Sequence, residues 1–473
     1  MASDGYRTGY GDNGIVDDQG YKPEYGSDEK YGSDDAEKGP SRAIGYKGKD
    51  DPFGDETNSE VKYRTMAWWQ AGMIMIAETI SLGILSLPSV LAAIGLVPGI
   101  ILIAGLGILA TYTGFVIGQF KLAYPHVHNM ADAGEVMLGP VGREVFGIAQ
   151  MLFLVFVMGS HILTFSIMMN VVTEHGTCTI VFGLVGFIVC LIFTMPRTLH
   201  KVSYMSIASF ISILSAVVIT MVGVGVERPG DGKVKVTEQQ SFPNAFLAVT
   251  NIIFAYAGHV AFFSFISELK RPETYPKALF LLQGVDTGMY LIVAIVTYRY
   301  AGSTVASPAL GSTNRLLQKI SYGIAIPTIV IAGVINGHVA AKYIYVRLFR
   351  GTDRMSKRTW SSFGLWALIV LVLWIIAWII AEAIPVFNDL LGLISALFAS
   401  WFTYGLSGVF WLFMNYGRYR ESPRKMFLTG LNFVIFCIGA AICGIGLYAS
   451  GKAIHDDSSS TQGSFTCADN SSS

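Results

Sequence analysis

The sequence contains eleven long apolar runs separated by short polar segments. A run of about 18 or more apolar residues is long enough to cross the hydrocarbon core of a bilayer as a helix. The sequence therefore predicts an all-α polytopic membrane protein with about 11 transmembrane helices. The expected spans are 66–94, 97–123, 145–173, 179–196, 203–226, 243–267, 278–300, 323–348, 362–383, 387–414 and 426–449. Residues 314–322 are compatible with a short interfacial helix or with the first part of the eighth span.

The composition supports this class. Of the 473 residues, 52% are hydrophobic and 14% are charged, whereas an average soluble domain is about 25% charged. A transmembrane β-barrel would alternate apolar and polar residues over segments of about 10 residues, and this chain does not. The five cysteines have no metal-ligand spacing, so we expect no metal.

The charge divides the chain into three parts. Residues 1–60 hold 15 acidic and 7 basic residues, a net charge of −8, and the remainder holds 18 and 26, a net charge of +8. We predict a disordered acidic cytoplasmic tail over 1–60, a transmembrane domain over 61–450 and a disordered Ser-rich tail over 451–473. The first tail is either simply solvated or a regulatory segment that binds partners. Because the basic charge belongs to the membrane domain, we expect no nucleic-acid partner.

Lys and Arg residues in the short loops predict the orientation. With the amino terminus in the cytoplasm, 18 of them flank the spans on the cytoplasmic side and 7 on the opposite side. Since cytoplasmic loops carry the excess of positive charge, the amino terminus is expected inside and the carboxyl tail outside. Cys178 and Cys467 then both lie outside, where they either pair or stay as thiols. Asn470 begins a glycosylation sequon on the same side, and its use is left open.

Glu78 places a carboxylate inside the first span. A charge in hydrocarbon costs several kcal/mol, so Glu78 should face protein. Gly83 and Pro88 weaken the helix after it, and we expect a break near Gly83. A broken helix at membrane depth is typical of a binding site. A carboxyl group removed from water favours its protonated form, so Glu78 is a candidate proton carrier; the alternative is a structural pairing with a neighbouring helix.

The sixth span contains a second weak point, because Gly258 could loosen the helix beside His259. His259 is either a proton-coupling residue or a hydrogen-bonded core residue. The free N–H groups of a broken helix can bind a carboxylate, and its free carbonyl groups can bind an ammonium group. The predicted substrate-binding residues are Thr79, Ile80, Ser81, Leu82, Gly83, Ile84, Phe254, Ala255, Tyr256, Ala257 and Gly258. We favour structural roles for His161, His338 and Asp286, and we expect Lys342 to extend towards the cytoplasmic surface.

The sequence contains none of the motifs that would indicate an enzyme. It has no Walker-type nucleotide loop, no paired carboxylates and no His/Cys cluster at one membrane depth. We therefore expect neither catalysis nor a cofactor. Any transport through this domain would draw its energy from an ion gradient.

Two segments resemble a known family. Gly83-Ile84-Leu85-Ser86-Leu87-Pro88 resembles the first-span signature of the amino acid/auxin permease family. The stretch from Phe254 to His259 resembles the sixth span of that family, and Glu268–Pro272 and Tyr275–Leu279 resemble the loop after it. The resemblance covers roughly residues 61–450 and is strongest to the fungal neutral amino acid permeases of the methyltryptophan-resistance type.

The resemblance implies a LeuT-type fold. Spans one to five and six to ten would form two inverted repeats, with one extra helix, and spans one and six would both be broken at the substrate. Many relatives have Gly-x-Gly at the first break, where this chain has Ser81-Leu82-Gly83, which leaves the size of the substrate open. Sodium-coupled relatives carry an Asn near the position of Glu78, so the carboxylate favours proton coupling.

Together these observations predict a proton-coupled symporter that carries neutral aliphatic and aromatic amino acids across the plasma membrane. Its partners would be the amino acids, protons and the lipid bilayer. Two alternatives remain open at this point. One is a vacuolar exporter or exchanger of the same fold, and the other is a transporter-like sensor that signals through the acidic tail.

Overall fold

The computed structural model describes residues 53, 62–230, 233–350, 352–357, 359–458 and 464–471. The predictions for residues 1–60 lie outside this part, apart from Phe53. The membrane helices and their connections are α1 Trp68–Ile94, α2 Leu96–Ala123, α3 Met130–Thr173, α4 Thr179–Phe193, α5 Leu199–Glu227, α6 Phe242–Ala255, α7 His259–Ser267, η1 Pro272–Thr274, α8 Tyr275–Ala301, η2 Gly302–Thr304, η3 Ala309–Ser312, α9 Arg315–Phe349, α10 Asp353–Ser356, α11 Trp360–Ala383, α12 Phe387–Ile394, η4 Ser395–Gly405, α13 Leu406–Met414 and α14 Pro423–Ser458.

The eleven predicted spans each coincide with one helix or with two or three consecutive helical elements. In the described part of the chain, ten helical segments are long and apolar enough to cross a membrane, and α4 is a shorter apolar helix of 15 residues. The segment before the eighth span is the beginning of α9, because Asn314 caps that helix by accepting a hydrogen bond from the Leu317 N–H group.

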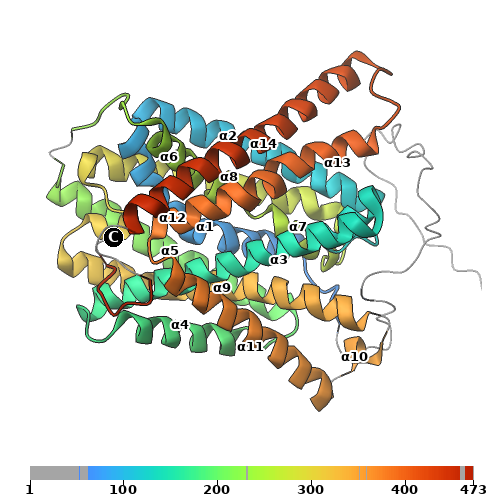
Figure 1. Cartoon of the computed structure of the whole chain (residues 1–473), viewed down its shortest axis with the longest axis horizontal. Helices are drawn as coiled ribbons and strands as arrows, with labels where there is room; N and C mark the ends of the chain where they lie inside the picture. The colour runs from blue at the N-terminus through green and yellow to red at the C-terminus, as the bar shows by residue number, and fades with distance from the viewer. Residues whose placement is uncertain are drawn as a thin grey trace, which may run out of the picture. The chain divides into compact units, whose positions relative to one another are not determined.

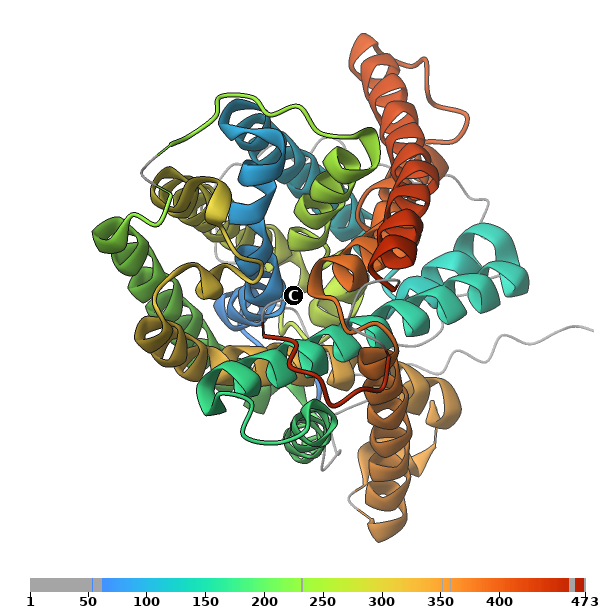
Figure 2. The same cartoon turned by 60° about the vertical axis from the view of Figure 1, so that its left-hand side comes forward.

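The spans form an inner and an outer group. In the most apolar part of α1, 89% of the residues are buried, and the corresponding share is 83% for α3, for α6 with α7, for α9 and for α12 to α13. The share falls to 28% for α11 and 22% for α14. Figures 1 and 2 show α1 (blue) among the other helices, with α14 (red) and α11 (brown) towards the edges. The inner spans are thus surrounded by protein on most sides, whereas α11 and α14 expose most of their apolar surface.

The first span is not broken, which corrects the prediction. The helix α1 runs from Trp68 to Ile94 through both Gly83 and Pro88. Gly83 serves close packing instead of unwinding, since a Cβ there would lie 2.7 Å from the Cα of Ala255 in α6. Serine hydroxyls bind helix carbonyl groups around the proline: Ser86 donates to Gly83 O and Ser89 donates to Ser86 O.

The sixth span is broken where the sequence predicts it. The helix α6 ends at Ala255 and α7 begins at His259, which leaves Tyr256, Ala257 and Gly258 between them. Because a helix start leaves its first N–H groups without partners in the helix, the N–H groups of the first turn of α7 are directed into this break. The break lies inside the protein, as non-helical backbone at this depth requires.

Two further irregularities were not predicted. The tenth span contains a π-helical stretch, η4, between α12 and α13. The third helix bends at Gly139, whose φ of 67° lies in the left-handed region, and Pro140 follows. Gly134, which precedes the bend, packs directly against Gly142, which follows it, since a Cβ on either glycine would overlap the backbone of the other.

The carboxyl end differs from the disordered tail that the sequence predicts. The helix α14 continues to Ser458, beyond the expected limit of the domain at residue 450. Cys467 forms a disulfide with Cys178 at the start of α4. Asn470 is buried, accepts a hydrogen bond from the Asn170 amide at 2.8 Å and donates one to Ser166. A glycan on Asn470 would require these contacts to be lost.

Candidate functional site

Glu78 lies directly against the break in the sixth span. Its Oε2 atom lies 2.6 Å from the position that a Cβ on Gly258 would take, and the Thr79 methyl group is equally close. The Glu78 carboxyl is buried, and its hydrogen-bond partner is the side chain of Asn336 in α9. Oε2 itself has no partner in the described part of the chain. The predicted buried carboxyl group of Glu78 therefore lies against the predicted break in the sixth span. A side chain at residue 258 would collide with Glu78, so this contact requires a glycine there.

Thr79 connects α1 to an acidic residue in α8. Its hydroxyl group lies 2.5 Å from Asp286 Oδ2 and 2.9 Å from the carbonyl oxygen of Met75, one turn earlier. Asp286 is buried, and its second oxygen, Oδ1, has no hydrogen-bond partner among the described residues. The site therefore contains two buried carboxyl groups. Glu78 directly precedes Thr79 in α1, and Asp286 contacts the Thr79 hydroxyl from α8.

Tyr290 joins three helices at the same level. Its hydroxyl group lies 2.7 Å from the carbonyl oxygen of Ala255 at the end of α6 and 3.1 Å from that of Thr79 in α1. Tyr290 follows Asp286 by four residues, so both project from one face of α8. Asp286 thus contacts the side chain of Thr79, and Tyr290 contacts its backbone carbonyl group.

The predicted substrate-binding residues fall into two groups. Gly83 and Ala255 form the close contact between α1 and α6, and Ile80, Leu82 and Ile84 are buried in the apolar core. The Tyr256 hydroxyl donates to Ile103 O in α2, which draws the ring away from α1. The second group lies beside the break or in α1 and consists of Phe254, Ala257, Gly258, Thr79 and Ser81. The Ser81 hydroxyl has no hydrogen-bond partner in the described chain.

His259 is anchored to the second span. Its Nε2 atom lies 2.9 Å from the carbonyl oxygen of Ala110 and 3.1 Å from the Thr113 hydroxyl. These contacts favour the reading of a hydrogen-bonded core histidine. His161 packs against Gly333 and His338 packs against Trp366. Nδ1 of His161 and both ring nitrogens of His338 have no hydrogen-bond partner in the described part of the chain.

The inner spans also hold other buried polar atoms without protein partners. These are side-chain atoms of Asn251 in α6, Asn336 in α9, Thr403 and Tyr404 in η4 and Ser407 in α13. Most buried polar groups in proteins are hydrogen-bonded, and an exception calls for an explanation such as a ligand. A polar ligand between these spans would have hydrogen-bonding groups available. In the described part of the chain, no three His, Cys, Asp or Glu side chains gather as a metal site would require.

A buried ion pair lies at the end of the molecule where α1 begins. Lys342 in α9 donates to Glu268 at the end of α7, and the two side chains are 2% and 0% exposed. The Tyr63 ring lies 5.2 Å from the Lys342 ammonium, and Met66 pairs with Leu269 through backbone hydrogen bonds. The expectation that Lys342 extends to the surface is thus wrong, because Glu268 provides an internal partner.

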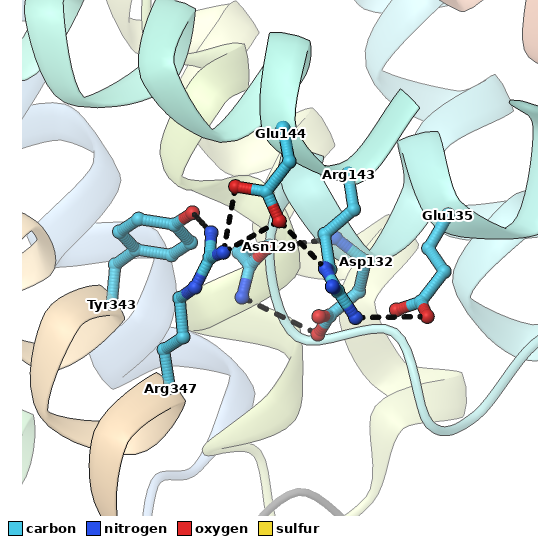
Figure 3. A network of polar contacts seen from close by, with 7 residues as sticks. All are labelled: Asn129, Asp132, Glu135, Arg143, Glu144, Tyr343 and Arg347. Carbon is cyan, nitrogen blue, oxygen red and sulfur yellow. Dashed lines mark hydrogen bonds and ion pairs between the residues drawn. The ribbon is translucent and has the colours of Figure 1, made fainter. Parts of the chain in front are cut away.

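An exposed network of ion pairs lies beside this buried pair (Figure 3). Arg347 in α9 binds both carboxyl oxygens of Glu144 in α3 at 2.7 Å and donates to the Tyr343 hydroxyl. Arg143 reaches Glu135 and Glu144. Exposed ion pairs contribute only about 0–1 kcal/mol each. We therefore expect the loss of one partner of the buried Glu268–Lys342 pair to destabilise this end more than the loss of one of these exposed pairs.

A cavity of about 540 Å³ opens at the opposite end of the inner spans. It is lined by Ser89, Asn170, Val171, Glu174, Val305, Ala306, Ser307, Pro308, Gly311, Arg315, Gln318, Tyr322, Asn388, Asp469 and Ser471. The tail bound by the disulfide thus supplies part of the wall. The Lys319 ammonium, 2.7 Å from Glu174, holds the pKa of that carboxyl below its usual range.

Tyr290 and Glu268 are not among the site residues predicted from the sequence, which favoured a structural role for Asp286. A signal for Asp286 and Tyr290 was present in the sequence, because an acidic residue in the middle of the seventh span is followed by a tyrosine four residues later. The Glu268–Lys342 pair joins residues 74 positions apart, and no local pattern connects them.

Comparisons with known proteins agree with this architecture. The family described as "Transmembrane amino acid transporter protein" matches residues 64–451. The chain is 36% identical over 419 residues to the N amino acid transport system protein of Neurospora crassa, covering 86% of this chain and 89% of that protein. It is 31% identical over 449 residues to a protein of Gibberella moniliformis named transmembrane transporter, covering 92% and 93%. The crystal structure of MhsT in complex with L-phenylalanine matches with a TM-score of 0.58 at 12% identity, covering 82% of this chain and 100% of that chain, which confirms the LeuT-type fold.

Proposed function

Because the chain belongs to the transmembrane amino acid transporter family, we propose that it carries neutral aliphatic and aromatic amino acids into the cell by proton-coupled symport. The observation that carries this proposal is the contact between the Glu78 carboxyl and Gly258. Glu78 is the proton carrier, and the substrate binds between α1 and the break in the sixth span. A tilting of α1 with the broken span alternately opens the site to each side.

The position of Glu78 links the proton to the substrate. The first turn of α7 offers N–H groups and the positive end of a helix dipole, which suit the carboxylate of an amino acid. An ionised Glu78 beside Gly258 competes for these groups and repels that carboxylate. A protonated Glu78 removes the competition. Substrate and proton therefore bind together, and each raises the affinity for the other by the same factor.

The surroundings of the break favour an uncharged substrate side chain. Phe254 and Ala257 are apolar and buried, and a charged side chain beside them would lack a partner at a cost of several kcal/mol. The name of the Neurospora crassa relative supports amino acids as substrates.

The disulfide supports the proposed orientation. Disulfides persist in oxidising compartments and are rare in the cytosol. Cys178 and Cys467 lie at the end of the molecule opposite to the start of α1. The charge of the loops and the redox chemistry thus agree on a cytoplasmic amino terminus, and we propose the plasma membrane as the location.

Uptake by purified protein in liposomes tests this function. Radiolabelled leucine or phenylalanine should accumulate against its gradient when the outside is acidic, with the membrane potential clamped at zero. Collapsing the pH gradient should abolish accumulation. The Glu78→Gln variant should accumulate about tenfold less substrate for each unit of pH gradient, since it carries one proton fewer.

Counterflow at equal pH on both sides controls for folding, because exchange of labelled for unlabelled substrate needs no net proton movement. Wild-type accumulation that ignores the pH gradient would exclude proton coupling. Wild-type accumulation by the Glu78→Gln protein would exclude Glu78 as the carrier.

A further inference from the structure

The contact between Thr79 and Asp286 places three oxygen atoms in a row. The Thr79 hydroxyl lies between Asp286 Oδ2 at 2.5 Å and Met75 O at 2.9 Å. A hydroxyl group has one proton and donates one hydrogen bond. Met75 O is a carbonyl oxygen and only accepts. Both contacts are hydrogen bonds at the same time only if Asp286 supplies the second proton.

A short chain of donors gives both contacts of the Thr79 hydroxyl a proton and leaves only Asp286 Oδ1, then an uncharged carbonyl oxygen, without a partner in the described chain. The protonated carboxyl of Asp286 donates to the Thr79 oxygen, and the Thr79 hydroxyl donates to Met75 O. An ionised Asp286 would instead take the only proton of Thr79 and would keep Oδ1 buried without a partner. A buried ionised carboxylate without a compensating partner is strongly unfavourable. The geometry therefore indicates a neutral Asp286 in this conformation.

The groups around Asp286 do not provide a counter-charge. The titratable groups that interact with it are Glu78 from α1, Tyr290 from its own helix and Tyr256 from the break. The helices α2 and α5 also pack against α8. Lys121 of α2 binds the carbonyl groups of Pro125 and Val127 at the end of its helix. Glu227 of α5 binds Asn314 at the opposite end.

We propose that Asp286 is a second proton-carrying carboxyl of this transporter, so that each amino acid crosses with two protons, one on Glu78 and one on Asp286. This inference rests on the proposed proton coupling. A proton from the outside solution converts the Asp286 carboxylate to the acid, and the Thr79 contact holds α1 against α8 in that state. Movement of α1 away from α8 breaks the contact and exposes Asp286, which returns the proton to water on the other side.

The accumulation plateau of the wild-type protein is sufficient to determine the number of coupled protons. In liposomes with the membrane potential clamped at zero, a neutral substrate accumulates about tenfold per unit of pH gradient for each coupled proton. Two protons therefore give about 100-fold accumulation at a gradient of one unit, and one proton gives about tenfold. A plateau near tenfold in the wild-type protein would overturn the second proton while leaving the proposed symport intact. Absence of any gradient-dependent accumulation would instead overturn the symport itself.

Variants identify the residue. Asp286→Asn keeps a donor for Thr79 but cannot release a proton, so the plateau should fall from about 100-fold to about tenfold, with counterflow retained. The combined Glu78→Gln and Asp286→Asn protein should exchange substrate without accumulating it. Thr297→Val is the matched control, because Thr297 is a buried threonine of α8 whose hydroxyl has no hydrogen-bond partner in the described chain, and its plateau should equal that of the wild type.

A wild-type plateau in the Asp286→Asn protein would assign the second proton to another group and overturn the proposal. If that variant fails in counterflow, the Thr79→Val protein tests the contact through which Asp286 is proposed to hold α1. It loses the contact to Asp286 but keeps the carboxyl, so its plateau should stay near 100-fold while its counterflow rate changes. A Thr79→Val protein with wild-type counterflow would show that the contact does not hold α1, and would also contradict the proposal.

Discussion

At the scale of single residues, two glycines decide how closely the inner spans approach each other. Gly83 admits the backbone of Ala255, and Gly258 admits the Glu78 carboxyl and the Thr79 methyl group. Neither glycine has a positive φ. Their importance therefore comes from the missing side chain, not from an unusual backbone conformation. A single added methyl group would separate the groups from which we build the site.

Gly258→Ala should reduce uptake at least tenfold. The new Cβ would lie 2.6 Å from Glu78 Oε2 and from the Thr79 methyl carbon, and overpacking of this kind costs about 1–3 kcal/mol. Gly284→Ala in α8 is the control, because a Cβ there has no other atom within 4 Å. Initial uptake rates and surface expression of the two variants check the prediction, and equal rates at equal expression would contradict it.

At the scale of helices, single polar contacts join helices that are far apart in the sequence. The Glu268–Lys342 pair joins the end of α7 to α9 and is fully buried, unlike the exposed network around Arg347 and Glu144. Removing one partner of a buried pair leaves an uncompensated charge, whereas replacing both with neutral groups is often well tolerated. The helices on either side of this pair belong to the proposed pathway, so its rupture should accompany opening at this end.

Lys342→Met should destabilise the protein by about 3–5 kcal/mol, because the Glu268 carboxylate is left buried and unpaired. The combination with Glu268→Gln should recover most of the loss. Thermal denaturation in detergent, followed by size-exclusion chromatography of the remaining folded protein, measures both. A double variant as unstable as the single one would show that the unpaired charge is not the cause.

The tail is a second element whose attachment is testable. Cys178 and Cys467 are disulfide-bonded, and Cys190, Cys437 and Cys443 are the free cysteines. Denatured protein should therefore react with three molecules of a maleimide reagent before reduction and with five after it, which mass spectrometry counts directly. Cys467→Ser should leave four reactive thiols without reduction. Five reactive thiols in the unreduced wild-type protein would refute the disulfide.

At the scale of the whole molecule, the two ends of the inner spans differ in character. The end where α1 begins holds a buried ion pair, backbone pairing and a cavity of about 310 Å³, whereas the other end holds the cavity of about 540 Å³ described above. With the predicted orientation, the larger cavity faces the outside, where substrate and protons arrive. The lowered pKa of Glu174 keeps its contact with Lys319 charged as that side becomes acidic, so acidification should leave this rim of the cavity in place.

The orientation gives a prediction for intact cells. An epitope attached after Ser473 should bind antibody without permeabilisation, and one attached before Met1 should bind only after it. The reason is the 18 to 7 distribution of Lys and Arg across the two sides. Labelling of the amino-terminal epitope in intact cells would reverse the assignment and place the cavity in the cytoplasm.

Much of the fold followed from the sequence, but the site followed only in part. The spans were predictable because apolar length is a property of each segment by itself. The break at Gly258 was predicted correctly and the one at Gly83 was not. A glycine in a membrane helix serves either unwinding or close packing, and the two uses leave the same local pattern. Glu78 was recognised because a lone carboxylate in an apolar run has to find a partner.

What the sequence determined by itself was the class of the protein, the approximate positions of its spans and the position of one buried carboxyl group. Only the tertiary structure decided which groups meet that carboxyl. Thr79 and Asp286 are 207 positions apart, and Cys178 and Cys467 are 289 apart. Burial and span length depend on neighbouring residues in the chain, whereas a hydrogen bond or a disulfide depends on which helices pack side by side. The role that we propose for Asp286 therefore rests on packing that no local pattern contains.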